Sequence, residues 1–507
     1  MDTASSLSLA KVLLPKMPMI GKTLLSHTLG LSPNSTHWDL KTELTVNILR
    51  SFTYGTLNPI SRTQAATLHD PGIKGRIWVS KVTLAVPSED DVRQKLFQVI
   101  EEVKDSGASH HDGGFIEPDL LPVEGEWTGY RAFCPKSASR LRISETRQYA
   151  EMMKEVTSPV TILYLHGGAH WLLDPASYRQ PIKKLAKLTG GRVLSLRYRL
   201  APQNPFPAAL LDCLVAYLNL LFPPAGSLHA AVSPENIIIS GDSAGGNLAL
   251  SLLLVLLHLN RTSQPITWNG ESHLIPLPAG LSLSSPWTDL LCSCPSLETN
   301  KAYDYIPPPS IFPAPHSIPY PSCPLWPTPP PRSNIYCEDT FLIHPLVSPL
   351  SAGASAWKGS PPILFQIGTE QLADESKILA ARMANVGVSV RWEEYEYMPH
   401  CFALLLPHLR GTKRCFESWA RFCGDVGELQ GVEKGEKKRE ITTNGVKISA
   451  DGVKETEVDV KGLWKESDEV VLERMRNRAR VLVSLGKEMD GNGNEDVNGG
   501  GNERARL

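Results

Sequence analysis

The pattern that most constrains the fold is a regular alternation of short apolar runs and helical stretches from about residue 159 onward. Helical spacing of apolar positions occurs at 179–189, 207–221, 247–259 and 372–386, and again at 413–423. Nearly continuous apolar strands that alternate with helices are typical of a mostly parallel sheet covered on both faces. The sequence therefore predicts an α/β fold, whose strands we assign to VTILYL, RVLSLR, NIIIS, GLSLS, PPILFQIG and VSVRWEEYEY.

Segments outside this alternation indicate how the chain is divided. Residues 1–60 are predicted to form a helical N-terminal cap or anchor-like segment, and residues 61–427 the main domain, which opens with two further strands around a helix at 92–104. Residues 292–338 are rich in proline and are interpreted as an excursion across the surface or as a lid. Residues 428–507 are charged and rich in glycine and asparagine, so we expect a largely disordered tail with one amphipathic helix at 467–486.

The overall charge and the cysteines exclude several classes of protein. The formal net charge is −2, with Lys+Arg 51 against Asp+Glu 53, and we expect no nucleic-acid partner. The 9 cysteines form no CxxC pair, so we expect free thiols in a reducing compartment and no zinc site.

The N-terminal stretch is apolar and basic, but it does not match a membrane span. Lys11, Lys16 and Lys22 divide it into pieces too short for a spanning helix, and it lacks an uninterrupted signal core. We therefore expect a cytoplasmic protein, with peripheral contact to a membrane through the N-terminus as the alternative. The sequence gives no indication of the oligomeric state.

The motif with the clearest chemical meaning is Gly-Asp-Ser-Ala-Gly at 241–245. It follows an apolar strand and precedes a Leu-rich helix, which is the context of a G-x-S-x-G nucleophile elbow. In such an elbow the hydroxyl of Ser243 projects from the carboxyl end of the sheet, where parallel sheets bind ligands. The motif predicts that Ser243 is a nucleophile.

A serine nucleophile needs donors for an oxyanion and a general base. The loop His-Gly-Gly-Ala at 166–169 follows a strand, and we predict that the backbone N–H groups of Gly167, Gly168 and Ala244 form the oxyanion hole. His400, directly after the last strand, is the predicted base. The remaining histidines are not predicted to be the base. His166 is interpreted as a brace of the glycine loop and His170 as a pocket or surface residue. His344 lies before the penultimate strand and His408 within an apolar segment, so neither is where the base should lie.

The orienting acid should follow the strand PPILFQIG, where two carboxylates compete. Glu370 lies two residues beyond the strand end, and Asp374 lies in the first turn of the next helix. Either could orient the imidazole, although Asp374 could instead serve the helix N-terminus. Cys401, beside the predicted base, is interpreted as a packing residue.

Taken together, the motifs resemble the hormone-sensitive-lipase-like (GDXG, fold-3) branch of the α/β-hydrolases. The matching pieces are YLHGGAH, YRLAPQNPFPAAL, GDSAGGNLAL, SPWTDL, HPLVSP, IGTEQLADES and YEYMPHCF, in the family's order over about 160–405. The resemblance implies an α/β-hydrolase fold with N-terminal cap segments, for which 1–56 and 200–225 are the candidates. It also prefers Glu370 over Asp374, because the family acid lies 30 positions before the histidine.

The chain departs from the family pattern at two positions. Glu370 stands where the family has Asp, and Ala169 stands where it usually has a third glycine. The proline-rich segment is similar to that of fungal members, some of which resemble steryl acetyl hydrolases.

The resemblance implies a serine esterase or lipase-like enzyme that cleaves carboxylic esters with apolar acyl groups through Ser243, Glu370 and His400, the small-molecule ester being its expected partner. A serine hydrolase mechanism needs neither a metal nor an organic cofactor. One alternative is a non-catalytic, small-molecule-binding relative, against which the intact His400 argues. The other is a steryl or acetyl ester deacetylase at a membrane surface.

Overall fold

The predicted parallel sheet is present in the computed structural model, which describes residues 13–54, 57–104, 114–312, 320–329, 332–427 and 441–492. Its ten strands lie in the order β1 (Ile77–Leu84), β2 (Val123–Tyr130), β4 (Arg192–Arg197), β3 (Thr161–Leu165), β5 (Ile237–Asp242), β8 (Gly280–Ser284), β9 (Ile363–Gly368), β10 (Val390–Tyr395), β11 (Asn444–Ile448) and β12 (Glu455–Glu457). From β4 to β11 neighbouring strands are parallel, and β1, β2 and β12 pair antiparallel at the two edges. The predicted α/β fold is confirmed.

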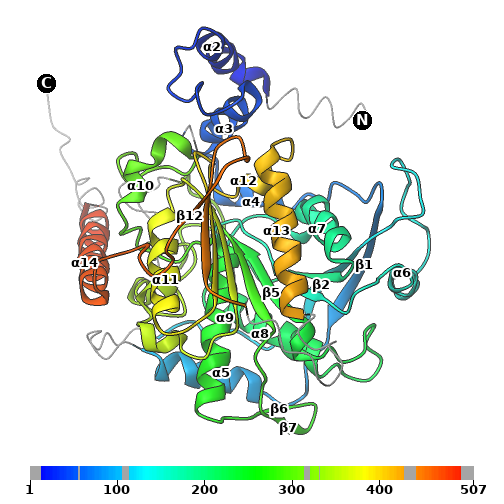
Figure 1. The fold of residues 1–507 in the computed structure, drawn as a ribbon. Coiled ribbons are helices and arrows are strands. Elements are labelled where there is room, and N and C mark those ends of the chain that lie inside the picture. The colour runs from blue at the N-terminus through cyan, green and yellow to red at the C-terminus, as the bar shows by residue number, and fades with distance from the viewer. Residues whose placement is uncertain are drawn as a thin grey trace, which may run out of the picture.

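Helices cover both faces of this sheet (Figure 1). The first face packs against α7 (Pro175–Thr189) and α13 (Arg410–Gly427), whose buried side chains share one core with Tyr164 and Ile238. The second face packs against α5 (Asp91–Glu102), α8 (Ala208–Leu221), α9 (Ala244–Arg261) and α11 (Ala373–Asn385). Strands buried on both faces need apolar residues at successive positions, which explains the near-continuous apolar runs of the sequence.

The Leu-rich helix that follows the elbow is a core helix. In the described chain α9 is the one helix long and apolar enough to cross a membrane, and 83% of its apolar window is buried inside the molecule. All nine cysteines lie in described segments and all are free thiols, as predicted.

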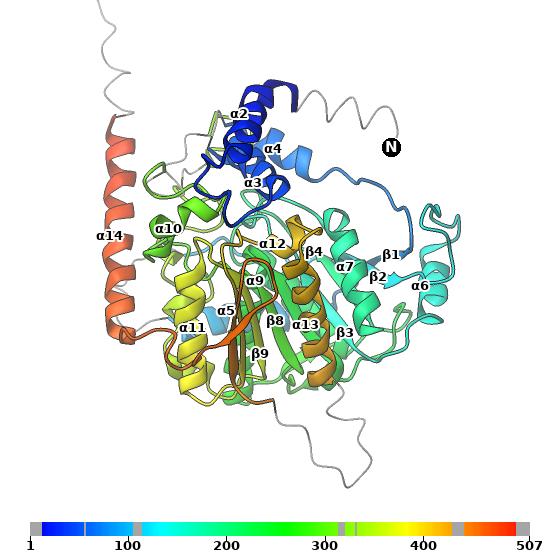
Figure 2. The same ribbon diagram turned by 45° about the horizontal axis from the view of Figure 1, so that its top comes forward.

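The N-terminal cap consists of α2 (Met17–Thr28) and α3 (Leu40–Thr53), which lie over the end of the sheet next to α12 (Phe402–Leu405) (Figures 1 and 2). Trp38 and Val46 are buried in the same core as α7 and α13. The prediction that 200–225 also caps the site is wrong. That segment contains α8, all of whose residues are buried, because its apolar residues pack against the sheet and α9.

The C-terminal region contains more structure than its composition predicts. Residues 444–448 form β11, which pairs in parallel with β10, and β12 follows as an edge strand. The described part of the predicted tail is therefore ordered, and the prediction of disorder is wrong for 441–466. The predicted amphipathic helix at 467–486 is confirmed as α14 (Asp468–Asn492). Residues 428–440 and 493–507 lie outside the described residues.

Several described parts of the proline-rich segment pack against the domain. It includes α10 (Ser296–Thr299) and a 3₁₀ turn, η3 (Lys301–Tyr303). Further along, Arg332 donates to the carbonyl of Pro202, and Tyr336 is buried. These parts form an ordered excursion, as the first of the two interpretations predicts. Residues 313–319 and 330–331 lie outside the described chain.

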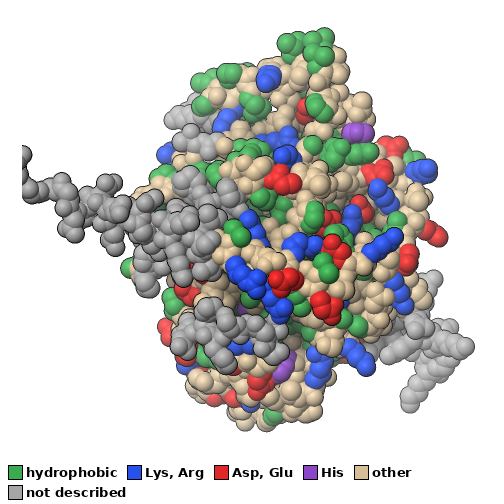
Figure 3. Space-filling model, turned by 90° about the vertical axis from the view of Figure 1, so that its left-hand side faces the viewer, with side chains coloured by type: hydrophobic (Ala, Val, Ile, Leu, Met, Phe, Trp, Pro, Cys, Tyr) green, Lys and Arg blue, Asp and Glu red, His purple; other side chains and the backbone are tan. Residues whose placement is uncertain are grey.

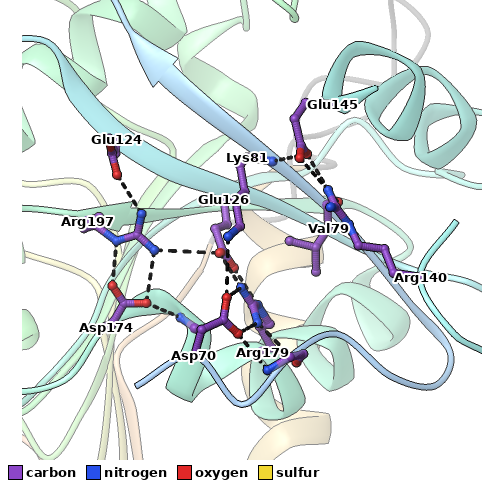
Figure 4. Close-up of polar contacts among 12 residues, drawn as sticks. Asp70, Val79, Lys81, Glu124, Glu126, Arg140, Glu145, Asp174, Arg179 and Arg197 are labelled. Atoms are coloured by element: carbon purple, nitrogen blue, oxygen red, sulfur yellow. Dashed lines mark hydrogen bonds and ion pairs between the residues drawn. The ribbon is translucent and has the colours of Figure 1, made fainter. Parts of the chain in front are cut away.

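Further described elements, besides short 3₁₀ turns, are α4 (Ile60–Thr67), α6 (Glu145–Met153), and the hairpin of β6 (Ile266–Trp268) and β7 (Glu271–His273). An ion-pair network near β1 and β2 joins α7 to the sheet (Figure 4). Arg179, 3% exposed, contacts the buried Glu126 at 2.6 Å and also pairs with Asp70.

Removing Arg179 is expected to destabilise the protein strongly. In Arg179→Met the buried Glu126 loses its 2.6 Å partner, and the one ion pair left to it in the described chain is a 3.9 Å contact to Arg197. Breaking a buried ion pair by removing one partner costs about 3–5 kcal/mol. Urea denaturation measures the loss. Arg140→Met is the matched control, because Arg140 and Glu145 are 30% and 38% exposed and their pair contributes about 1 kcal/mol or less. Equal losses in the two variants would contradict the assignment.

Candidate active site

Ser243 lies at a sharp turn between β5 and α9. Its φ of 51° is unusual for a residue with a side chain, and such strain is typical of functional turns. The flanking glycines are required by close contacts. A Cβ on Gly241 would lie 2.4 Å from the carbonyl oxygen of Gly245, and one on Gly245 would lie 2.0 Å from that of Leu165. The structure thus has the geometry of the predicted elbow.

The N–H of Gly167, predicted to face the oxyanion, is occupied. It donates to Oδ1 of Asp242 at 3.0 Å and lies 3.1 Å from the hydroxyl of Tyr178. Asp242 is buried and also accepts hydrogen bonds from Tyr164 and Tyr178. The prediction for Gly167 is therefore wrong, because its N–H group stabilises a buried carboxylate instead of facing the space above Ser243.

The backbone N–H groups of the glycine loop that have no acceptor in the described chain are those after Gly167. The backbone N–H groups of Gly168, Ala169 and Ala244 donate no hydrogen bond to any residue of the described chain. Gly168 has a φ of 108°, and a Cβ there would lie 2.2 Å from the carbonyl oxygen of Leu172, so glycine is required. Ala169 has a φ of 52°, and its N–H group, unlike that of Gly167, has no acceptor in the described chain.

Glu370 and His400 are brought together by the loops after β9 and β10. Oε1 of Glu370 lies 3.1 Å from Nδ1 of His400, and both side chains are buried. Burial alone would lower the pKa of His400, but the negative charges of Glu370, Asp304 and Asp242 raise it above its usual value. In the described chain no hydrogen bond joins Ser243 to His400, a contact that commonly tightens only when substrate binds.

The competing carboxylate, Asp374, serves a different structural purpose. Its Oδ2 accepts the backbone N–H of Ser296 at 2.9 Å, and its own N–H donates to the hydroxyl of Ser296 at 3.2 Å. These bonds attach the first turn of α11 to the proline-rich segment. The geometry therefore pairs Glu370, and not Asp374, with the imidazole.

Ser285, which the sequence analysis missed, connects the loops that carry Ser243, Glu370 and His400. Its hydroxyl donates to Oε2 of Glu370 at 2.6 Å and accepts the N–H of Cys401 at 3.0 Å. Its carbonyl oxygen accepts the N–H of Ser243 at 3.2 Å. The only signal in the sequence was its position directly after β8, at the same edge of the sheet as the other site residues.

The other histidines of the sequence analysis are accounted for by packing. His166 stacks on Tyr198 with ring centroids 4.3 Å apart, and burial lowers its pKa to about 4, so it braces the loop as a neutral ring. His170 is fully buried against Tyr336, and burial lowers its pKa to about 3. His344 is buried and bonded to the carbonyl of Ile100, and His408 contacts Asp39.

Two further observations concern reactive groups and metals. Burial raises the pKa of the Cys401 thiol well above its usual value, which keeps it protonated beside Asp242.

Within the described segments no group of three or more His, Cys, Asp or Glu side chains could hold a metal ion.

Comparisons with known proteins show what the chain is similar to. A family model described as "alpha/beta hydrolase fold" matches residues 162–311 and 331–404, which include every site residue discussed above. An acetyl-hydrolase of Streptomyces hygroscopicus is 32% identical over 258 residues, 51% of this chain and 73% of that protein. An esterase of Acinetobacter venetianus is 29% identical over 54% of this chain and 77% of its own length.

Solved structures are similar as well. The crystal structure of an esterase from the bacterial hormone-sensitive lipase family has a TM-score of 0.49 and 22% identity, covering 77% of this chain and 99% of that one.

Proposed function

Because the chain belongs to the hormone-sensitive-lipase-like family of α/β-hydrolases, we propose that it hydrolyses carboxylic esters through Ser243, His400 and Glu370. The observation that carries the proposal is the buried Glu370–His400 pair beside a serine on a strained elbow. The intact His400 supports this function over that of a binding protein that has lost catalysis. The protein is thus a carboxylic ester hydrolase of the esterase type.

The mechanism follows from the placement of these groups. His400 accepts the proton of Ser243 as the hydroxyl attacks the ester carbon, and Glu370 stabilises the imidazolium. The N–H groups of Gly168, Ala169 and Ala244 stabilise the oxyanion of the tetrahedral intermediate. His400 then protonates the leaving alcohol, and a water activated by His400 releases the acid from Ser243.

The substrate is proposed to be a small apolar ester with a short acyl group. Two relatives, from Streptomyces hygroscopicus and Mycobacterium tuberculosis, are named as acetyl-hydrolases, one of them putative. We also propose a placement among the fungal members of the family that resemble steryl acetyl hydrolases, because the proline-rich segment at 292–338 resembles theirs.

The test of this function is labelling combined with turnover. A fluorophosphonate should attach to the full-length protein, and peptide mapping should find the adduct on Ser243. Hydrolysis of p-nitrophenyl esters of graded chain length should be fastest for the short acyl groups. A protein that neither labels nor turns over any ester of the series would refute the proposal.

The acidic limb of the pH profile of kcat/KM should lie at a higher pH than an unperturbed histidine would give. Only neutral His400 accepts the serine proton, so kcat/KM falls as the pH drops through the pKa of His400. Because its carboxylate neighbours raise this pKa, the midpoint should lie above about 6.5, the usual value. A pH profile of kcat/KM measures it, and a midpoint below that value would contradict the geometry.

We further propose that the protein is cytoplasmic and contacts a membrane surface through its N-terminal cap. Exposed hydrophobic side chains gather there, at the top of the molecule in Figure 3. Lys16 and Lys22 lie among them, and residues 13–31 include no acidic side chain, which suits anionic headgroups. We call this the apolar cap surface, and it consists of Leu14, Met17, Leu24, Leu25, Leu29, Leu31 and Phe52.

Vesicle sedimentation tests this contact. The full-length protein should pellet with anionic vesicles more than with neutral ones, and Leu25→Glu combined with Leu29→Glu should abolish pelleting. Phe133→Glu is the matched control, because Phe133 is 90% exposed but lies outside the cap. Equal pelleting of both variants would contradict the proposal.

A further inference from the structure

A short segment, residues 300–306, lies between the N-terminal cap and the loops that carry Glu370 and His400. We call it the clamp segment. Asp304 within it is fully buried, and its Oδ2 accepts the N–H of Gln371 at 2.8 Å. Its Oδ1 accepts the N–H of His400 at 3.3 Å. Asn300 adds a bond of 2.9 Å from its side-chain amide to the carbonyl oxygen of Glu370. The clamp segment therefore holds both loops of the acid–base pair.

The cap holds the clamp segment from the opposite side through its backbone. Nε of Arg50 donates to the carbonyl oxygen of Asp304 at 2.7 Å, and Thr53 donates to that of Tyr305 at 2.7 Å. Tyr54 donates to the carbonyl of Ile306 at 2.8 Å. These three residues belong to α3 and its C-terminal end, which lie outside the region matched by the family model.

The environment of Asp304 requires an explanation, because a buried carboxylate is costly without compensation. Its charge is compensated by the N–H groups of His400, Gln371 and Tyr305, and no cationic side chain pairs with it in the described chain. Burial raises the pKa of Asp304, whereas the charge of His400 and the N–H donors favour its ionised form. The carboxylate is thus placed where it can interact with a protonated imidazole.

We propose that Asp304 is a positioning residue that fixes the loops of Glu370 and His400 and favours the imidazolium, and that α3 holds it in place. The proposal rests on the proposed function, since it assigns a role within the same triad. The titratable groups that face His400 are Glu370, Asp304 and Asp242, with Tyr305 and Cys401 packed beside them.

The test compares two variants of the full-length protein. In Asp304→Asn the shape is kept and the charge is lost, so the acidic limb of kcat/KM should move to lower pH by on the order of half to one unit. The value of kcat per fluorophosphonate-labelled site should fall about tenfold or more. In Arg50→Met the charge stays, so kcat should fall while the limb keeps its wild-type position.

Asp289→Asn is the control, because Asp289 is also buried and bonded to backbone N–H groups, at Leu291 and Ser293, but contacts neither loop. It should leave the limb unchanged. If Asp304→Asn does not fold, Asp304→Glu should lower kcat without moving the limb, since the charge remains. A wild-type limb in folded Asp304→Asn, or a shifted limb in Asp304→Glu, would overturn the proposal. Failure of the wild type to label would refute the esterase function instead.

Discussion

Replacing Ser243 with alanine is expected to lower kcat by about 10⁶-fold, the loss seen when a triad enzyme keeps its site but loses its nucleophile. No other group described at the elbow can form the acyl-enzyme, because the nearby thiol of Cys401 is buried and its raised pKa keeps it protonated. Fluorophosphonate labelling should also disappear. The measurements are burst-phase turnover of a short p-nitrophenyl ester and intact-mass analysis of the labelled protein.

The matched control for this substitution is Ser240→Ala. Ser240 lies on β5, three residues before Ser243, is fully buried, and donates to the carbonyl oxygen of Ser282 at 3.0 Å. Its loss should lower the stability slightly but leave labelling and turnover per folded molecule at wild-type values. Labelling that persists in Ser243→Ala would show that another residue is the nucleophile.

The elbow and the base could be predicted because both depend on local sequence. A strand, a glycine–serine–glycine turn and a helix must follow one another in the chain, and His400 directly follows the β-rich run that forms β10. The oxyanion hole could not be predicted to the residue. Whether Gly167 or Ala169 donates depends on Asp242, whose carboxylate reaches across from the neighbouring strand to bind the N–H of Gly167.

The C-terminal strand was missed for a related reason. Residues 444–448 are few and mixed in polarity, and they become a strand only through parallel pairing with β10. The segment around them is indeed charged, but its composition does not reveal that residues 444–448 pair with β10. A Cβ on Gly445 would lie 2.8 Å from Val458, so even the glycine, a disorder signal in the sequence, is required by packing. Asp304 escaped notice because prolines dominate the segment around it.

Replacing Glu370 with glutamine is expected to lower kcat on the order of 10³–10⁴-fold, whereas Asp374→Asn should cost less than about tenfold. The first variant removes the charge that stabilises the imidazolium. The second removes a charge that serves only the junction of α11 with Ser296. Steady-state kinetics of both variants on one ester measure the difference, and a larger loss in Asp374→Asn would show that Glu370 is not the triad acid.

The size of the Glu370→Gln effect follows from the hydrogen bonds around its two oxygens. Oε2 accepts from both the hydroxyl of Ser285 and the N–H of Gly368, so the carbonyl oxygen of a glutamine must occupy that position. The amide NH₂ then faces Nδ1 of His400, where Oε1 stood. A donor at this place forces Nδ1 to accept, and the ring proton moves to Nε2. In that tautomer the imidazole presents a proton to Ser243 instead of a lone pair, and it cannot act as the base.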